Sequence, residues 1–245
     1  MGALMEDFVD IHCHFVAGVD DGAVTVDDGL ALLARLRQIG FASVYATPHM
    51  RAGLFDNERA GLQAAFERMQ AAVAGRADMP RIGLACEHHL DDTVFARLVS
   101  GQGVPYPSGR AALIELPNER FPLRLGERMF ELRCKRIRPV LAHPERYRPV
   151  WRDRQVLDPL LDGGVVLLMD LGALAGKYGR AVRRCAEELL EEGYYYAASS
   201  DAHRAEDVDA VAAGIRRLFE LAGEQDATFM LREGPQAILD GKVED

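Results

Sequence analysis

The sequence is poor in cysteine, and it has no long hydrophobic run. Its four cysteines, Cys13, Cys86, Cys134 and Cys185, include no Cys-x-x-Cys pair, a pattern typical of reduced thiols rather than of a disulfide framework. No apolar stretch approaches the ~20 residues that a membrane span requires. The N-terminal MGALMEDFVD has neither the basic nor the apolar segment of a secretion signal. We therefore expect a soluble, cytoplasmic protein.

The same scarcities disfavour two kinds of hydrolase. Cysteine-dependent phosphatases need an arginine six positions after the nucleophile, and none of the four cysteines has one. Many metal amidohydrolases bridge two ions with a lysine at a strand end. The chain has only Lys135, Lys177 and Lys242, and none of them follows a predicted strand. Thiol chemistry and a carbamylated-lysine centre are both disfavoured.

Length and charge set the broad class. The chain has 245 residues, 49% hydrophobic and 27% charged, with a formal net charge of −9. That length is close to the ~250 residues of a single α/β barrel, and no linker or repeat divides it, so we predict one domain over 1–245. The acidic balance argues against a general nucleic-acid surface and against binding to anionic membranes.

Hydrophobic patterning predicts seven strands that alternate with helices. The strands are expected at 8–11, 42–46, 81–86, 111–114, 137–142, 165–169 and 194–199, and the helices at 26–39, 57–74, 91–99, 123–135, 154–161, 181–192 and 206–221, with a short helical piece near Pro235. This alternation is typical of a parallel sheet. An open doubly wound sheet would give a similar string, but it would gather its ligands at one switch point.

Polar residues follow most of these strands, which favours a barrel. In barrels the site is built at the carboxyl ends of several different strands. Two histidines at a spacing of two, His12 and His14, leave the first strand on one face, and Asp201 and His203 repeat this spacing after the last one. The complete set is His12, His14, Asp21, His49, Glu87, Glu115, His143, Asp201 and His203.

Taken singly, each of these residues has an ordinary structural explanation. A lone buried histidine is usually a satisfied core residue, and a carboxylate after a strand is commonly a helix cap. Nine of them at successive strand ends predict instead a site for two or three metal ions that share carboxylate bridges. Closely spaced ions lower the pKa of a bridging water and clamp the oxygens of an in-line phosphoryl displacement.

Five segments make the prediction more specific: DIHCHFVAGVDDG at 10–22, ATPH at 46–49, LIELP at 113–117, LAHPERY at 141–147 and SDAH at 200–203. In this order they resemble the motifs of the PHP (polymerase and histidinol phosphatase) superfamily, and most closely the bacterial manganese-dependent protein-tyrosine phosphatases of capsule and exopolysaccharide operons. The resemblance implies a distorted (β/α)7 TIM-like barrel and three divalent metal ions, Mn before Fe or Zn.

The same resemblance implies a role for each strand-end residue. One ion would be held by His12, His14, Glu87 and Asp201, and a second would share Glu87 and add Glu115 and His143. The third would take Asp21, His49 and His203. Arg146, in HPERY, matches the arginine that contacts the substrate phosphate, which suits the fixed fork of a guanidinium.

The chain departs from the family at one position that bears on substrate binding. Relatives often carry a second phosphate-binding arginine a few residues after the D-x-H motif, where this chain has Val208. Arg204 and Arg51 are the candidates to replace it. No general acid for the leaving group is assigned. Asp56 is one candidate, although a turn or cap role is the stronger expectation there.

Several neighbours of the site remain open on sequence grounds. Cys13 should point away from the histidines and pack in the core. His88 and His89 are expected either to line the pocket or to lie on the surface. Asp10 could orient His12 or form a plain strand-end salt bridge, and Asp20 is interpreted as turn chemistry.

The preferred function is hydrolysis of a phosphomonoester, with phosphotyrosine on a bacterial tyrosine kinase tail as the substrate that the resemblance implies. A hydroxide bridging two ions would attack phosphorus while Arg146 offsets charge on the phosphoryl oxygens. The first alternative is a small-molecule phosphatase, such as one for histidinol phosphate. The second is a non-catalytic module that binds metal for structure. The sequence makes no prediction of oligomeric state.

Overall fold

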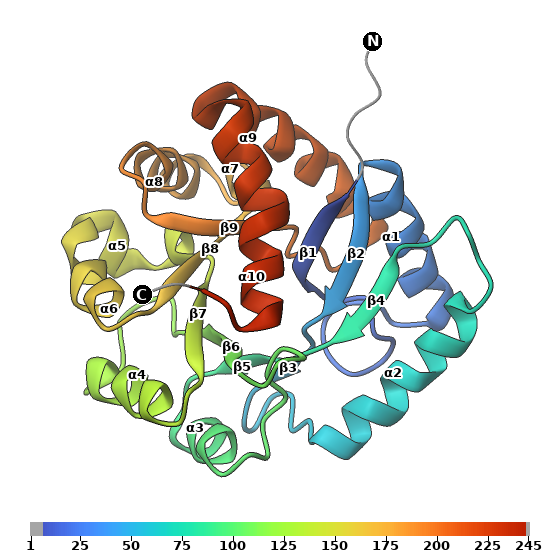
Figure 1. Cartoon of the computed structure of the whole chain (residues 1–245), viewed down its shortest axis with the longest axis horizontal. Coiled ribbons are helices and arrows are strands. Elements are labelled where there is room, and N and C mark those ends of the chain that lie inside the picture. Colours follow the sequence, from blue (N-terminus) through green and yellow to red (C-terminus); the bar gives the residue numbers. More distant parts are fainter. Residues whose placement is uncertain (1–6, 244–245) are drawn as a thin grey trace.

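Parallel strands form the wall of a barrel in the computed structural model, which describes residues 7–243 (Figure 1). Hydrogen bonding places the strands in the orders β1-β2-β4 and β3-β5-β6-β7-β8-β9. The bounds within the described range are β1 (Phe8–Cys13), β2 (Phe41–Ala46), β3 (His49–Met50), β4 (Arg81–Leu84), β5 (Glu87–His89), β6 (Ala111–Glu115), β7 (Arg138–Ala142), β8 (Val166–Asp170) and β9 (Tyr195–Ser199).

Nine strand segments stand where seven strands were predicted, because the predicted strands at 42–46 and 81–86 are each followed, after a short break, by a second segment that the prediction did not include. Thr47-Pro48 separates β2 from β3, and proline has no N–H to donate to a neighbouring strand. Ala85-Cys86 separates β4 from β5 at the same height. The wall stays hydrogen-bonded across the break, since Ala85 N donates to Ala46 O at 2.8 Å and Glu87 N to Pro48 O at 3.2 Å. The distortion therefore bends the wall without opening it.

The first and last strands meet at their carboxyl ends. Asp201 N donates to His12 O at 2.9 Å, and His14 N donates to Ala202 O at 2.9 Å. A parallel bridge pairs Cys13 with Ala202. These contacts close the barrel at the end where the polar residues lie. The prediction of an α/β barrel is confirmed.

Helices surround the wall. α1 begins with a capping box in which Thr25 Oγ1 accepts from Asp28 N at 3.2 Å, an arrangement that satisfies free N–H groups of the first turn. The α-helices of the described range are α1 (Val26–Gln38), α2 (Arg59–Val73), α3 (Asp92–Val99), α4 (Leu125–Cys134), α5 (Arg148–Arg152), α6 (Asp158–Asp162), α7 (Leu171–Leu174), α8 (Arg180–Glu191), α9 (Val208–Thr228) and α10 (Gly234–Asp240). The same range has 3₁₀ turns at Pro144–Arg146, Arg154–Leu157 and Ala205–Asp207, and a π-helical turn at Phe229–Glu233.

Three helical predictions need correction. The helix expected at 154–161 is a 3₁₀ turn followed by α6, and α5 and α7 were not predicted because four or five residues are too few to show a helical period. The helix expected to end at 221 continues to Thr228 across a kink at Gly223, whose φ is 79°. Glycine adopts this left-handed conformation without steric cost.

Apolar side chains fill the inside of the barrel at its amino-terminal end. Ile11, Leu113 and Leu168 from the wall pack in one cluster with Ile238 and Leu239 of α10, and Figure 1 shows α10 lying across the ring of strands. The phenol of Tyr106, in the same cluster, donates to Ile11 O at 2.9 Å. A second apolar layer lies between the wall and the outer helices. This end is therefore closed by packing.

Two sequence predictions concern the chain as a whole. Within residues 7–243 no helix combines the length and hydrophobicity needed to cross a bilayer. Residues 1–6, part of the segment interpreted as lacking a secretion signal, lie outside the described range. The single-domain organisation stays a prediction.

Candidate active site

The nine strand-end residues converge at the carboxyl end of the barrel. They form four overlapping groups whose possible ligand atoms lie within 4.8 Å of one another. Each group draws on at least two different strand ends, so the barrel and not one local motif assembles them. The groups are His14, Asp21, His49 and His203; His12, His14 and Glu87; His12, His143 and Asp201; and His49, Glu87 and Glu115.

Glu87, the first residue of β5, lies at the centre of the cluster. Its Oε2 is 3.2 Å from His12 Nε2, 3.5 Å from His14 Nε2 and 3.1 Å from His49 Nδ1. Its Oε1 faces the other way, 3.0 Å from His143 Nε2. The two oxygens of this buried carboxylate therefore face different sets of imidazoles, so Glu87 would be able to contribute a ligand atom to each of two metal positions.

Asp201 divides its oxygens in the same way. Its Oδ1 is 3.2 Å from His12 Nε2 and 3.4 Å from His14 Nε2. Its Oδ2 accepts a hydrogen bond from Arg146 Nη1. One carboxylate thus joins the histidine pair of β1 to the guanidinium of the HPERY segment.

A second set of ligand atoms lies nearer to solvent. Asp21 Oδ1 is 3.5 Å from His49 Nε2 and 3.5 Å from His203 Nε2, and the Asp21 side chain is 58% exposed. The His203 ring stacks on His14 with centroids 4.0 Å apart. This set borders the opening of the site, while Glu87 and Asp201 lie beneath it.

The grouping differs in part from the one the resemblance implies. Glu115 groups with His49 and Glu87, and His143 groups with His12 and Asp201, whereas Glu115 and His143 were expected to share one ion. His14 also approaches the Asp21 set. The shared residue, Glu87, is within reach of both arrangements.

The donor atoms fit divalent metal ions. The Nε2 atoms of His12 and His14 and the Nδ1 atom of His49 are buried without a hydrogen-bond partner. Buried polar atoms are normally paired, so three orphaned nitrogens facing carboxylates call for another ligand. Imidazole and carboxylate donors together suit Mn, Fe or Zn.

Two further contacts orient the histidines. His14 Nδ1 is 2.8 Å from Asp20 Oδ2, which leaves Nε2 directed at Glu87 and Asp201. His203 Nδ1 lies 3.1 Å from Asp201 O, which leaves Nε2 directed at Asp21. Such partners fix the tautomer and the ring orientation of metal-binding histidines. Asp20 does hold a turn, through Gly22 N at 3.0 Å, but turn chemistry alone is an incomplete interpretation.

Opposed charges shift the pKa values of the buried groups. Burial acts to lower the pKa of His12, but the carboxylates of Glu87 and Asp201 outweigh it and the net pKa is raised. Burial acts to raise the pKa of Glu87 and of Asp201, yet the nearby imidazoles hold both well below their usual range. A hydrogen bond from His203 lowers the pKa of Asp21 to about 2. The carboxylates are therefore ionised at neutral pH.

Backbone strain marks two of the same residues. His143 has φ 35° and Asp201 has φ 43°, both in the left-handed region that non-glycine residues rarely adopt. Strain of this kind persists where the surrounding structure over-determines the position, and it clusters at functional sites. The two residues turn their side chains into the site directly after β7 and β9.

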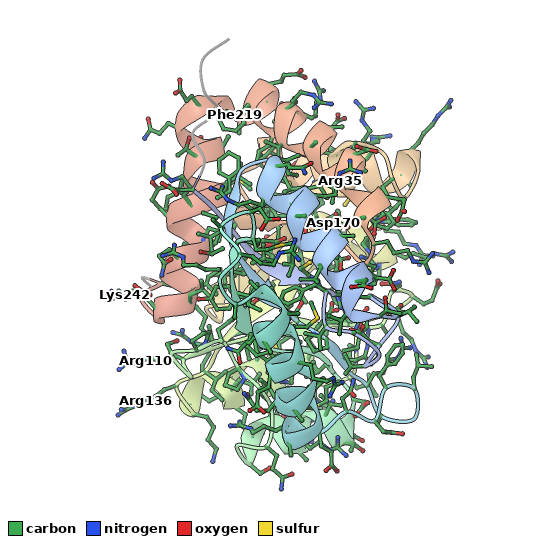
Figure 2. The ribbon with its side chains drawn as sticks, turned by 90° about the vertical axis from the view of Figure 1, so that its right-hand side faces the viewer. Arg35, Arg110, Arg136, Asp170, Phe219 and Lys242 are labelled. Atoms are coloured by element: carbon green, nitrogen blue, oxygen red, sulfur yellow. The ribbon has the colours of Figure 1, made fainter. Side chains whose placement is uncertain are left out.

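Arg146 extends the cluster on one side. Its Nη1 is 3.7 Å from Asp170 Oδ2, in addition to the contact with Asp201. Its guanidinium carbon lies 4.7 Å from the centroid of the Tyr178 ring. Asp170, labelled in Figure 2, is buried at the end of β8 and was missed by the sequence analysis. The signal was present: a single aspartate ends the apolar run VVLLM.

Arg204 and Arg51, the two candidates to replace the second phosphate-binding arginine, follow the candidate ligands His203 and His49 in the chain. Arg204 is exposed, and its backbone N donates to Asp207 at 3.0 Å. Arg51 forms a backbone bridge with Phe55, whose ring stacks on His49 at 5.4 Å. Substrate binding by Arg204 or Arg51 stays a prediction. Asp56 accepts from Gly53 N at 2.9 Å, which is the turn role expected for it.

The open neighbours have defined positions. Cys13 packs in the outer apolar layer, and its thiol donates to Ala202 O at 3.3 Å, so it does not face the histidines. His89 Nδ1 contacts Glu115 Oε2 at 2.7 Å and borders the site. His88 is buried and accepts from Val104 N at 3.1 Å, a structural role. Asp10 accepts from the backbone of His12 at 3.2 Å and of Ser200 at 3.1 Å, which is neither of its two predicted roles.

Together these features define a class: an α/β barrel with a multi-carboxylate, multi-histidine centre at its carboxyl end and an arginine beside it. The model of the family described as "Capsular polysaccharide synthesis, CpsB/CapC" matches residues 8–240. The chain belongs to this family, and the predicted membership is confirmed.

Known relatives are similar over most of their length. The tyrosine-protein phosphatase YwqE of Bacillus subtilis is 26% identical over 232 residues, covering 94% of this chain and 91% of the relative. The putative tyrosine-protein phosphatase CapC of Staphylococcus aureus is 23% identical over 80% of this chain and 76% of its own. A crystal structure from the work on YwqE and Streptococcus pneumoniae CpsB, "unique metal-dependent tyrosine phosphatases", superposes with TM-score 0.89 at 25% identity, covering 97% and 96% of the two chains.

Proposed function

We propose that the chain is a metal-dependent protein-tyrosine phosphatase that uses three divalent ions, with Mn as the expected metal and Fe or Zn as alternatives. The observation that carries the proposal is that two buried carboxylates each direct their two oxygens at different partners. Glu87 presents its oxygens to different histidines, and Asp201 presents one oxygen to His12 and the other to Arg146. This arrangement couples metal binding to phosphate binding.

The residues divide into those that hold ions and those that hold substrate. The ligands are the nine residues at the strand ends, with Glu87 and Asp201 shared or central. Bound divalent ions lower the pKa of a coordinated water and offset charge on phosphoryl oxygens. Arg146 offers its guanidinium fork to the remaining oxygens. Because Asp201 holds Arg146 in place, the fork is oriented before substrate arrives, which limits reorganisation during the reaction.

The substrate class follows from the relatives. YwqE and CpsB are named tyrosine-protein phosphatases, and the family is described by capsular polysaccharide synthesis. The proposed substrate is therefore a phosphotyrosine protein, specifically the tail of a bacterial tyrosine kinase of capsule or exopolysaccharide synthesis. Histidinol phosphate is the competing small phosphomonoester.

Elemental analysis of untreated protein, combined with phosphate release from a phosphotyrosine peptide and from histidinol phosphate, tests the proposal. We expect about three equivalents of metal and higher kcat/KM on the peptide. Arg146→Met should keep the metal and lose about 10²- to 10³-fold in kcat/KM, as when one preorganised donor is removed. Higher kcat/KM on histidinol phosphate would replace the substrate assignment. Stoichiometric metal without phosphate release would identify a non-catalytic module.

A further inference from the structure

Lys177 shares an aromatic ring with Arg146. The Lys177 Nζ lies 5.3 Å from the centroid of the Tyr178 ring, and the Arg146 guanidinium carbon lies 4.7 Å from the same centroid. Cations at such distances are attracted by the ring. The Tyr178 ring is therefore in contact with two cationic side chains, one from the 3₁₀ turn after β7 and one from the segment that follows α7.

The position of Lys177 is fixed by a second contact. Its Nζ is 2.9 Å from Asp207 Oδ1, while Asp207 Oδ2 accepts the backbone N–H groups of His203 and Arg204 at 2.9 and 3.0 Å. The ion pair thus ties Lys177 to the segment that carries His203. An ammonium has three donors, so this pairing leaves protons for another acceptor.

The stem of Lys177 also passes close to Gly172, beside the Asp170 carboxylate that faces Arg146. A Cβ placed on Gly172 would be 3.1 Å from both Lys177 Cδ and Asp170 Oδ1. The absence of a side chain at Gly172 therefore allows the lysine stem and the Asp170 carboxylate to lie close to the backbone at this position. Asp170 is in turn 3.7 Å from Arg146. The side chains of Lys177 and Arg146 are 24% and 22% exposed, partly sheltered, where a charge acts more strongly than in bulk water.

Building on the phosphatase function proposed above, we infer that Lys177 is a substrate-binding residue that donates to a phosphoryl oxygen alongside Arg146. A phosphomonoester dianion offers three terminal oxygens. Arg146 supplies a planar fork and Lys177 a compact point charge, a combination that suits the dianion better than a carboxylate. Since the contact is available to substrate and product alike, it should act mainly on binding.

Steady-state kinetics and inhibition by inorganic phosphate, measured on the metal-loaded protein, test this assignment. Lys177→Met should raise KM for a phosphotyrosine peptide and Ki for phosphate by roughly tenfold each, the loss of one charge-assisted hydrogen bond, with kcat within about twofold. Lys177→Arg should restore most of the affinity. Arg180→Met, which removes an equal charge from the start of α8, is the matched control and should change neither constant.

Asp207→Asn separates substrate binding from a purely structural ion pair. The amide oxygen can still accept from His203 and Arg204, but the pairing with Lys177 is lost. Because Asp207→Asn keeps the ammonium of Lys177 and removes only its ion-pair partner, it should raise KM and Ki by less than Lys177→Met does. Equal constants in the two variants would mean that Lys177 serves only to hold Asp207, and that result would overturn the inference. Unchanged KM and Ki in Lys177→Met would do the same. If wild type fails to hydrolyse the peptide, the proposed function itself fails, a result distinct from either outcome.

Discussion

The two ends of the barrel bury different kinds of side chain. At the carboxyl end, ionised carboxylates and imidazoles are buried together, as with Glu87 and His12. At the amino-terminal end, α10 inserts Ile238 and Leu239 into an apolar cluster. Burying apolar side chains stabilises a fold directly, whereas burying charges costs free energy unless partners or metal compensate it. We infer that apolar packing at the amino-terminal end stabilises the barrel, and that this stability offsets the cost of burying charged groups at the carboxyl end.

Charged residues occur at both ends, but they are placed differently. Arg110, Arg136 and Lys242 project outward at the end that α10 covers (Figure 2). Lys242 there is paired with Asp240 at 2.9 Å. The side chains of these three residues point away from the interior of the barrel. A substitution at the carboxyl end should therefore change chemistry first, and one at the apolar end should change stability first.

The largest effect is expected for Glu87→Gln. The variant keeps the shape of the side chain but removes the charge that faces four histidines, so metal should be lost and activity should fall at least 10³-fold, in the range of other essential groups. Elemental analysis and phosphate release measure both. Glu224→Gln, at an exposed position, is the control. Full metal content in Glu87→Gln would contradict the central role of this carboxylate.

Ile238→Ala should have its effect on stability. Ile238 is fully buried, and removing its outer carbons should cost about 2–5 kcal/mol of unfolding free energy. Urea denaturation measures this cost, and Ile238→Val should cost about 0.5–1.5 kcal/mol. The kcat of the folded variant should equal that of wild type. A loss of kcat larger than the unfolded fraction explains would erase the proposed separation between the two ends.

Asp20→Asn sharpens the comparison within the carboxyl end. In the wild-type structure, Asp20 Oδ2 lies 2.8 Å from His14 Nδ1 and 3.1 Å from His49 N. The amide of the variant can occupy the same place, but it lacks the negative charge that makes His14 a better metal ligand. Loss of such a partner typically weakens metal affinity by about 10- to 100-fold. Metal titration of chelator-treated protein measures it. Equal affinity in variant and wild type would return Asp20 to turn chemistry alone.

Some features of the fold and the site can be predicted from the sequence, and others cannot. The α/β barrel and the positions of His12, Glu87 and Asp201 follow from local strand patterns, because each residue stands at a strand end. Contacts made across the barrel do not follow in this way. The pairing of Asp20 with His14, and the meeting of Asp170, Tyr178 and Lys177 around Arg146, depend on loop conformations that no periodicity encodes. The short helices α5 and α7 were missed for another reason, since four or five residues show no helical period.

The smallest predicted effect lies behind Arg146, at Glu145. This carboxyl group is fully buried, accepts from Asp170 N at 2.9 Å and contacts the Tyr195 phenol at 2.9 Å. Burial, reinforced by the nearby Asp170 carboxylate, raises the pKa of Glu145 from 4.5 to about 8. A pKa raised on folding gives stability that is complete below the unfolded pKa and is lost as pH rises through the folded one.

Glu145→Gln removes this proton and with it one source of pH dependence. The unfolding free energy of wild type should therefore fall relative to that of the variant between about pH 4.5 and 8, leaving the variant with the higher Tm at pH 9. At pH 4 the two should nearly match, because Glu145 is then mostly protonated in both the folded and the unfolded chain, and the amide oxygen can still accept from Asp170 N. Chelator-treated protein should be used, so that metal binding does not add its own pH dependence. Parallel stability profiles from pH 5 to 9 would mean that Glu145 ionises in the fold as readily as in the unfolded chain, and the buried pair behind Arg146 would then carry charge at neutral pH.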